Sequence, residues 1–228
     1  MKTLSLATIL SKQNPALINT DDEYLVLSPF EDEELEAKSK VCFIKYEVDT
    51  LAFVLAMVCA KVFNDDTRFM DIDDGYLSGE SNVGDEEIDE IIEFLKACER
   101  VIVAPEIFKQ TNGASLEFML GLLCSHFKLK CVDLNANNIE LKGELSELED
   151  SGDFNGACVF YYNAKANELL GSALFANVAK LKDGAQITLK TNFGEIPTTF
   201  RIDKTLKGTI ALFAHPSAQN YFEKLKLA

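Results

Sequence analysis

The acidic run at residues 71–75, with the sequence Asp-Ile-Asp-Asp-Gly, is the stretch of this chain that comes nearest to a metal site. Carboxylate oxygens are the ligands that Ca²⁺ prefers, so the spacing of an EF-hand loop is the first test. A loop that begins at Asp71 would need an oxygen ligand at position 75, glycine at 76 and glutamate at 82. The chain has Gly75, Tyr76 and Asn82 at these positions. We therefore predict no calcium site and interpret residues 64–84 as a polar surface loop.

The two histidines, His126 and His215, are the next candidates for chemistry. Neither has a serine or cysteine together with an acid in a catalytic spacing, and the chain contains no G-x-S-x-G sequence. Carboxylates are abundant, but no pair has a spacing that identifies an acid and base couple. We interpret both histidines as structural or surface residues. The sequence nominates no catalytic, cofactor-binding or metal-binding residue.

The six cysteines lie mostly inside apolar runs, and no two of them have C-x-x-C spacing. This pattern disfavours an iron–sulfur or zinc cluster built from this chain alone. Buried free thiols are typical of proteins in the reducing cytosol. The cysteines are Cys42, Cys59, Cys98, Cys124, Cys131 and Cys158.

The elements that would have to position a site are clearest between residues 85 and 134. Residues 85–95 form an acidic amphipathic pattern with Ile88, Ile91, Ile92 and Leu95 on one helical face. A short apolar run at 101–104 predicts a buried strand, a helix follows at about 115–127, and a second strand follows at 131–134. This order predicts a βαβ unit with parallel strands, and so an α/β fold with a Rossmann-like open parallel sheet.

The loop that follows the strand at 101–104 lacks the features that bind a phosphate. Residues 105–113 contain a single glycine, so there is no G-x-G-x-x-G, and no G-x-x-x-x-G-K-[ST] sequence occurs anywhere in the chain. We therefore expect the frame of a nucleotide-binding fold without its phosphate loop, and we predict no cofactor.

The remaining elements divide the chain into two predicted domains. The first, residues 1–155, should contain strands at 24–27 and 41–46, a loop or short helix at 31–36, and a buried helix at 50–63 capped by Asp49 or Thr50. Residues 1–10 should form a strand or a helix, and residues 135–155 a connector with one helical turn near 145–148.

The second domain, residues 156–228, has the alternating pattern of short strands joined by turns. Strands are predicted at 157–162, 187–191, 196–202 and 208–213, with turns at 183–184, 192–194 and 207–208. These features predict a small C-terminal β-barrel followed by a C-terminal helix.

The net charge restricts the possible partners. The chain carries 22 basic and 37 acidic residues, and residues 1–100 alone hold 23 acidic against 9 basic residues. This balance argues against nucleic acid as a partner. The acidic surface is either solvated surface or a docking face for a basic partner. The longest unbroken apolar run, residues 51–60, is far shorter than the ~20 residues that cross a bilayer, and the N-terminus lacks a signal-peptide cleavage site.

Two groups of short motifs resemble one known protein family. The first group is similar to the C-terminal β-barrel of molybdopterin-type oxidoreductases: Leu181-Lys182-Asp183-Gly184 before a strand, then Phe193-Gly194-Glu195, then Lys207-Gly208 and an apolar strand. Residues 45–48, 75–84 and 101–106 look like the later part of the large iron–sulfur (G) subunit of bacterial NADH-quinone oxidoreductase, respiratory complex I. Together the motifs cover about residues 41–214.

The resemblance implies a non-catalytic accessory subunit of a respiratory electron-transfer complex. The family's cluster-binding cysteine motifs are missing, and no residue matches its molybdenum ligand. The implied partners are other subunits of the complex, at the cytoplasmic face of the inner membrane and without a transmembrane segment in this chain.

Two alternatives stay open. The first is a small-molecule protein that binds a flavin or nucleotide in the crevice at the carboxyl ends of strands 101–104 and 131–134. The second is a relative of the central domain of thiamine-diphosphate enzymes, which would require adjoining catalytic domains.

Overall fold

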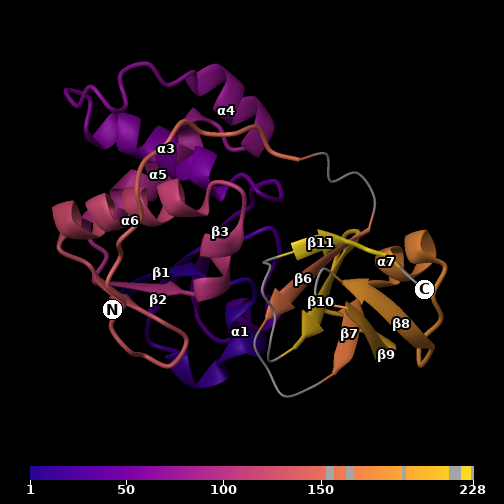
Figure 1. Cartoon of the computed structure of the whole chain (residues 1–228). Coiled ribbons are helices and arrows are strands. Elements are labelled where there is room, and N and C mark those ends of the chain that lie inside the picture. Colours follow the sequence, from indigo (N-terminus) through magenta and orange to yellow (C-terminus); the bar gives the residue numbers. More distant parts are fainter. Residues whose placement is uncertain (153–156, 163–166, 192–193, 216–221, 227–228) are drawn as a thin grey trace. The chain divides into compact units, whose positions relative to one another are not determined.

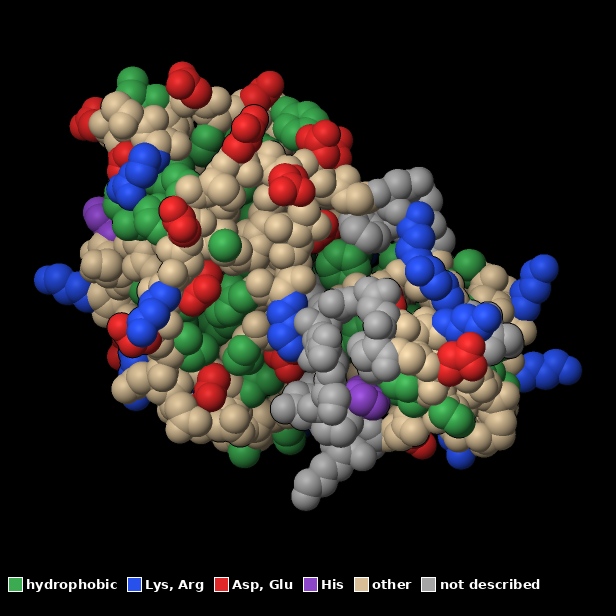
Figure 2. Space-filling view, in the orientation of Figure 1, with side chains coloured by type: hydrophobic (Ala, Val, Ile, Leu, Met, Phe, Trp, Pro, Cys, Tyr) green, Lys and Arg blue, Asp and Glu red, His purple; other side chains and the backbone are tan. Residues whose placement is uncertain are grey.

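The computed structural model describes residues 1–152, 157–162, 167–191, 194–215 and 222–226, and the chain divides into two compact units after Gly152 (Figure 1). The first unit holds 31 acidic and 13 basic residues, a net charge of −18, while the second holds 6 and 9, a net charge of +3. Acidic side chains are spread over the visible face of the first unit (Figure 2). The negative charge therefore belongs to one folded unit rather than to the whole chain.

The first unit is built on a five-stranded sheet in which every pair of neighbouring strands is parallel. The strand order β3-β2-β1-β4-β5 is that of a Rossmann-like sheet, which confirms the predicted fold class. The strands are β1 (Lys2–Leu6), β2 (Glu23–Leu27), β3 (Lys40–Ile44), β4 (Arg100–Val103) and β5 (Lys130–Val132).

The N-terminal segment, for which the sequence predicts a strand or a helix, forms the central strand β1. Its residues Leu4 and Leu6 are almost completely buried, and so are Thr3 and Ser5, which alternate with them. A strand buried on both faces loses the alternation that identifies a strand in sequence. This explains why the pattern of residues 1–10 was ambiguous.

Helices cover the sheet, and one of them lies inside the helical layer. In α3 (Leu51–Val62) the nine residues Leu51 to Cys59 are all buried, because α4, α5 and α6 pack around it. The helical elements of this unit are α1 (Leu10–Gln13), η1 (Pro15–Leu17), α2 (Glu33–Glu36), α3, α4 (Asp74–Ser81), α5 (Asp85–Lys96), η2 (Pro105–Lys109) and α6 (Gly113–Phe127). Among the residues that the structure describes, no helix is long and apolar enough to cross a membrane.

The predicted amphipathic helix is α5. Ile88, Ile91 and Leu95 are buried as predicted, Ile92 is half-buried, and Phe94 joins the buried face. The N-terminus of the helix has a capping-box contact, in which the backbone N–H of Gly84 donates to Glu87 Oε2 at 3.0 Å. The prediction for residues 85–95 is confirmed almost to the residue.

The prediction of a surface loop over residues 64–84 is partly wrong, because α4 lies within it. Asp73 caps this helix by accepting a hydrogen bond from the backbone N–H of Tyr76 at 3.0 Å. Leu77 and Ser81 face inward, and α4 packs on α3. Two glycines in eight residues give α4 little intrinsic helix propensity, so its contact with α3 decides the outcome.

The predicted helical turn at residues 145–148 is also wrong. Residues 141–152, which we call the strap, contain no helical residue. They cross the surface of α6 instead. The strap exchanges hydrogen bonds with α6, and these bonds replace those that a helical turn would have made.

The second unit is a curled six-stranded sheet with the order β11-β6-β10-β7-β9-β8. It mixes parallel pairs, β6 with β10 and β7 with β9, with antiparallel ones. The two edges meet, because the backbone N–H of Lys190 on β8 donates to the carbonyl of Lys226, just after β11, at 2.8 Å. Its elements are β6 (Cys158–Tyr162), β7 (Glu168–Gly171), α7 (Ala173–Ala179), β8 (Gln186–Thr191), β9 (Gly194–Ile202), β10 (Ile210–Ala214) and β11 (Phe222–Lys224).

The core of this unit is aromatic, with Tyr161, Phe175, Phe200 and Phe213 all buried inside the curl. The predicted C-terminal helix is wrong for residues 222–224, which form β11 and pair with β6. Residues 225–226 are not helical either, while residues 216–221 and 227–228, and residues 192–193 of the predicted turn at 192–194, lie outside the described residues.

Candidate functional site

The two histidines belong to different units of the chain. His126 is exposed in the last turn of α6, where its ring makes edge contacts with Phe63 and Phe127. His215 follows β10, and its ring stacks on Phe213. Each histidine therefore lies in an aromatic contact.

All six cysteines are free thiols, and five of them are buried. Cys42 is half-buried, and its Sγ donates to Glu90 Oε1 at 3.0 Å. Burial, together with this carboxylate, raises the pKa of the Cys42 thiol to about 12. A thiol with this pKa is a poor nucleophile at neutral pH.

The acidic run at 71–75 forms the start of α4 and the loop before it. Asp73 caps the helix, as described above. In the described part of the chain, no group of three or more His, Cys, Asp or Glu side chains is arranged to hold a metal ion.

The crevice of the α/β sheet lies one strand away from the expected place. Connections from β1 run towards β2 and β3, whereas the connection from β3 returns to the other side of β1 and places β4 there. The topological switch point is therefore between β1 and β4, rather than between β4 and β5.

The residues that follow the two strands bordering this crevice are buried. Ile9, after β1, and Ile107, after β4, are almost completely buried, and Ser28 Oγ donates to the carbonyl of Thr8 at 2.7 Å. The buried carboxyl of Glu106 lies at the same edge. The first glycine of the chain is Gly75, so the turn after β1 has no glycine to let a pyrophosphate approach the backbone. These features disfavour a phosphate-bearing cofactor.

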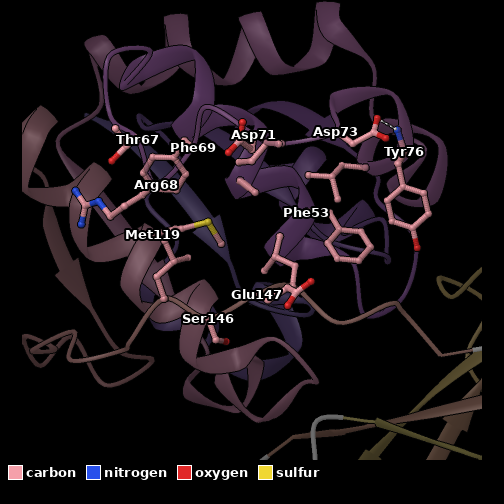
Figure 3. A pocket seen from close by; sticks show the side chains of 15 residues that line it. Phe53, Thr67, Arg68, Phe69, Asp71, Asp73, Tyr76, Met119, Ser146 and Glu147 are labelled. Atoms are coloured by element: carbon pink, nitrogen blue, oxygen red, sulfur yellow. Dashed lines mark hydrogen bonds between the residues drawn. The ribbon is translucent and has the colours of Figure 1, made fainter.

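A separate cavity of about 450 Å³ lies in the helical layer of the first unit (Figure 3). Its walls come from α3, the loop at 67–73, α4, α6 and the strap. This volume lies within the range of small-molecule sites in proteins, ~300–1,000 Å³. It is therefore a candidate small-molecule site.

The interior of the cavity is mostly apolar. Phe53 from α3, Phe69 from the loop and Met119 from α6 are buried and line it, and Leu145 and Leu148 close it from the strap. Phe53 and Tyr76 lie side by side with ring centroids 6.3 Å apart. Figure 3 shows these two rings near one end, with Phe69 and Met119 towards the other.

The charged groups around the cavity are mainly acidic. Asp71 and Asp73 lie on one side and Glu147 on the other (Figure 3). The single lining cation, Arg68, donates to both carboxylate oxygens of Asp66, and its guanidinium lies 5.2 Å from the centroid of the Phe118 ring. The hydrogen bonds from Arg68 hold the pKa of Asp66 at about 2, so this ion pair persists at neutral pH. Asp71, Asp73 and Glu147 therefore have no cation of the lining left to neutralise them.

The strap that forms one wall is fixed to α6 at several points. Ser115 Oγ accepts from the backbone N–H of Ser146 at 3.1 Å, and Glu117 Oε1 accepts from the backbone N–H of Lys142 at 2.9 Å. A Cβ on Gly143 would lie 2.2 Å from the carbonyl oxygen of Ala114, so only glycine allows this close approach. These contacts fix the strap, and with it this wall of the cavity, on the surface of α6.

A buried carboxylate joins the end of the strap to the helices. Asp49, which adopts a positive φ of 68°, accepts hydrogen bonds from the backbone N–H and the hydroxyl of Thr111 at 3.1 and 2.6 Å. Burial raises the pKa of Asp49, while the hydrogen bonds from Thr111 and from the backbone of Gly152 oppose the shift.

The sequence interpretation missed this cavity. One signal pointed to it: the apolar run at 51–59 has no polar face, so α3 must be covered on all sides. Leu141, Leu145 and Leu148 in the connector were the matching signal for a covering segment. The two segments are far apart in the sequence, and no sequence pattern shows that they contact each other.

No protein-family model matches the chain, and a search of curated proteins finds no match.

Proposed function

We propose that this chain is a non-catalytic accessory subunit of an NADH-quinone oxidoreductase-like respiratory complex. In this proposal it lies at the cytoplasmic face of the inner membrane and is held there by partner subunits. Its first unit would contact a basic surface of a cluster-bearing partner.

The observation that carries the proposal is the conformation of three glycines. Gly184, Gly194 and Gly208 have φ values of +78°, +127° and +76°, and they are the glycines of the motifs that resemble the molybdopterin-type β-barrel. Side chains are disfavoured at such φ values, so these residues are required by the turns of a curled sheet. The positive φ values agree with the turns that the resemblance implies at these glycines.

The charge distribution supports the choice of partner. The first unit has a net charge of −18, and a surface of this kind attracts basic partners and disfavours acidic ones. Part of the charge on α5 is balanced within the chain, because Lys61 bridges Asp85 and Asp89, and Lys96 pairs with Glu93. Glu86 and Glu90 are exposed and have no lysine or arginine partner in the described residues.

Purification of the tagged full-length chain from its own cells tests the proposal. Quinone oxidoreductase subunits should co-purify in stoichiometric amounts. Their absence from a mild-detergent preparation that retains the assembled complex would contradict it. Charge reversal at Glu86, Glu90 and Glu93 should weaken the recovery several-fold. The matched control reverses the exposed Glu34, Glu36 and Glu99, and full recovery with both variants would show that α5 is only solvated surface.

The alternative function is binding of a flavin or nucleotide, and the observation that favours it is the switch point between β1 and β4. The buried Glu106 and the glycine-free turn after β1 oppose it. Thermal unfolding with FMN, FAD and ATP distinguishes the two, since a ligand that binds only the folded state raises the unfolding temperature. An unchanged unfolding temperature at millimolar ligand would exclude this alternative.

A further inference from the structure

We propose that the cavity between α3, α4, α6 and the strap is a binding site for a small organic cation with an apolar body, such as an aralkylamine. This inference is independent of the proposed subunit role. It rests on the volume of the cavity, its apolar interior and the sign of the charges around it.

The apolar body would lie against Phe69 and Met119. Both residues belong to the mostly apolar lining, and a ligand that enters the cavity displaces water from it. The volume of about 450 Å³ accommodates a ligand with one aromatic ring and a short alkyl chain.

The cationic group would lie at the end formed by Phe53, Tyr76 and Glu147 (Figure 3). The Tyr76 ring, which is 41% exposed and lies beside the buried Phe53 ring, favours a cation against its face, and the Glu147 carboxylate adds direct attraction. Tyr76 is held in place because its hydroxyl donates to Asp150 Oδ1 at 2.6 Å. This hydrogen bond, in which Asp150 is the acceptor, raises the pKa of Tyr76 to about 12, so its ring stays neutral across the physiological range.

The charges select against anionic and neutral ligands. Asp71, Asp73 and Glu147 would repel a carboxylate or phosphate, while the Arg68 guanidinium is engaged by Asp66 and points away from the centre of the cavity (Figure 3). A neutral molecule of the same shape would keep the apolar contacts and lose the attraction to the carboxylates.

The test uses the full chain labelled with ¹³C at its methionine methyl groups. The chain has four methionines, and Met119 lines the cavity, whereas Met1, which precedes β1, is not among its lining residues. The probes are 3-phenylpropylamine, 3-phenylpropan-1-ol and 3-phenylpropionate, which share one apolar body. We expect 3-phenylpropylamine to shift the Met119 signal saturably while the Met1 signal stays fixed. Binding should be strongest for the amine, weaker for the alcohol and undetectable for the acid.

Two double variants distinguish binding at the carboxylates of the cavity from a general attraction of the amine to the acidic chain. Asp71→Asn with Glu147→Gln should weaken amine binding roughly three- to tenfold and leave the alcohol unchanged, since each solvent-exposed charge contact is weak. Asp65→Asn with Glu144→Gln removes the same charge from residues outside the lining and should leave both ligands unchanged. The methyl spectra show that each variant is folded. The proposal is overturned if Met119 shows no saturable shift at millimolar amine, if the three probes bind alike, or if the two double variants weaken binding equally.

Discussion

Asn112, at the N-terminus of α6, and Glu149, on the strap, form a reciprocal pair of hydrogen bonds. The side-chain amide of Asn112 donates to the carbonyl of Glu149, and its Oδ1 accepts from the Glu149 backbone N–H, each at 2.9 Å. Asn112 is only 4% exposed, so water competes little for either bond. The Asn112 side chain thus bonds both the N–H and the C=O of Glu149, as the backbone of a neighbouring β-strand would.

Replacing this residue should release the end of the strap. In Asn112→Ala both hydrogen bonds are lost, and we expect the free energy of unfolding to fall by about 1–3 kcal/mol. Faster amide hydrogen exchange in residues 141–152 is the local signature. Asn138→Ala, at an exposed position, is the matched control and should change neither quantity. Unchanged exchange in the strap of Asn112→Ala would show that the apolar contacts alone hold it.

Two glycine substitutions should change the free energy of unfolding in opposite directions. Gly143→Ala places a Cβ against the backbone of α6, 2.2 Å from Ala114 O, so the strap has to lift, and we expect a loss of about 2 kcal/mol. Gly79→Ala lies within α4, where a Cβ meets nothing within 4 Å, and should stabilise by about 0.5–1 kcal/mol. Urea unfolding measures both. Equal changes in stability for the two substitutions would contradict the close packing of the strap on α6.

Asp49 should make the stability of the first unit depend on pH. Its pKa is raised in the folded chain, so between the ordinary aspartate pKa and the raised value the folded state binds more protons than the unfolded state. Its contribution to stability therefore falls as pH rises through this window. The difference in unfolding free energy between the wild type and Asp49→Asn should decrease with pH across the window and be flat above it.

The same titration with Asp65→Asn, at an exposed position, provides the reference curve for Asp49. A wild-type minus Asp49→Asn difference that is independent of pH would contradict the assignment.

The alkylation rate of Cys42 should depend on Glu90. Burial and the Glu90 carboxylate raise the pKa of this thiol to about 12, so alkylation by iodoacetamide at neutral pH should be slow. Glu90→Gln removes the acceptor charge, lowers the pKa and should speed the reaction several-fold. Rates measured against pH with mass-spectrometric assignment test this. Glu86→Gln on the same helix is the control, and an equal rate increase there would point to general surface charge.

Part of this protein is determined by its sequence alone. The apolar face of α5, the buried run of β4 and the alternating strands of the second unit depend on interactions between residues close in sequence. Their periodicity is therefore visible without the structure, and so is the absence of a phosphate-binding loop. The glycines at 184 and 208 likewise mark turns that need a positive φ, which is a local property of the chain.

Other features were decided only by the tertiary structure. The central position of β1, the helix α4 and the seat of the strap on α6 depend on contacts between segments far apart in the sequence. Residues 74–81, which include two glycines, have a weaker helix propensity than residues 145–148, yet the first segment packs on α3 as a helix and the second crosses α6 without a helical turn. The sequence does not show that the cavity forms, because its lining residues Phe53, Tyr76, Met119 and Glu147 come from four separate segments of the chain.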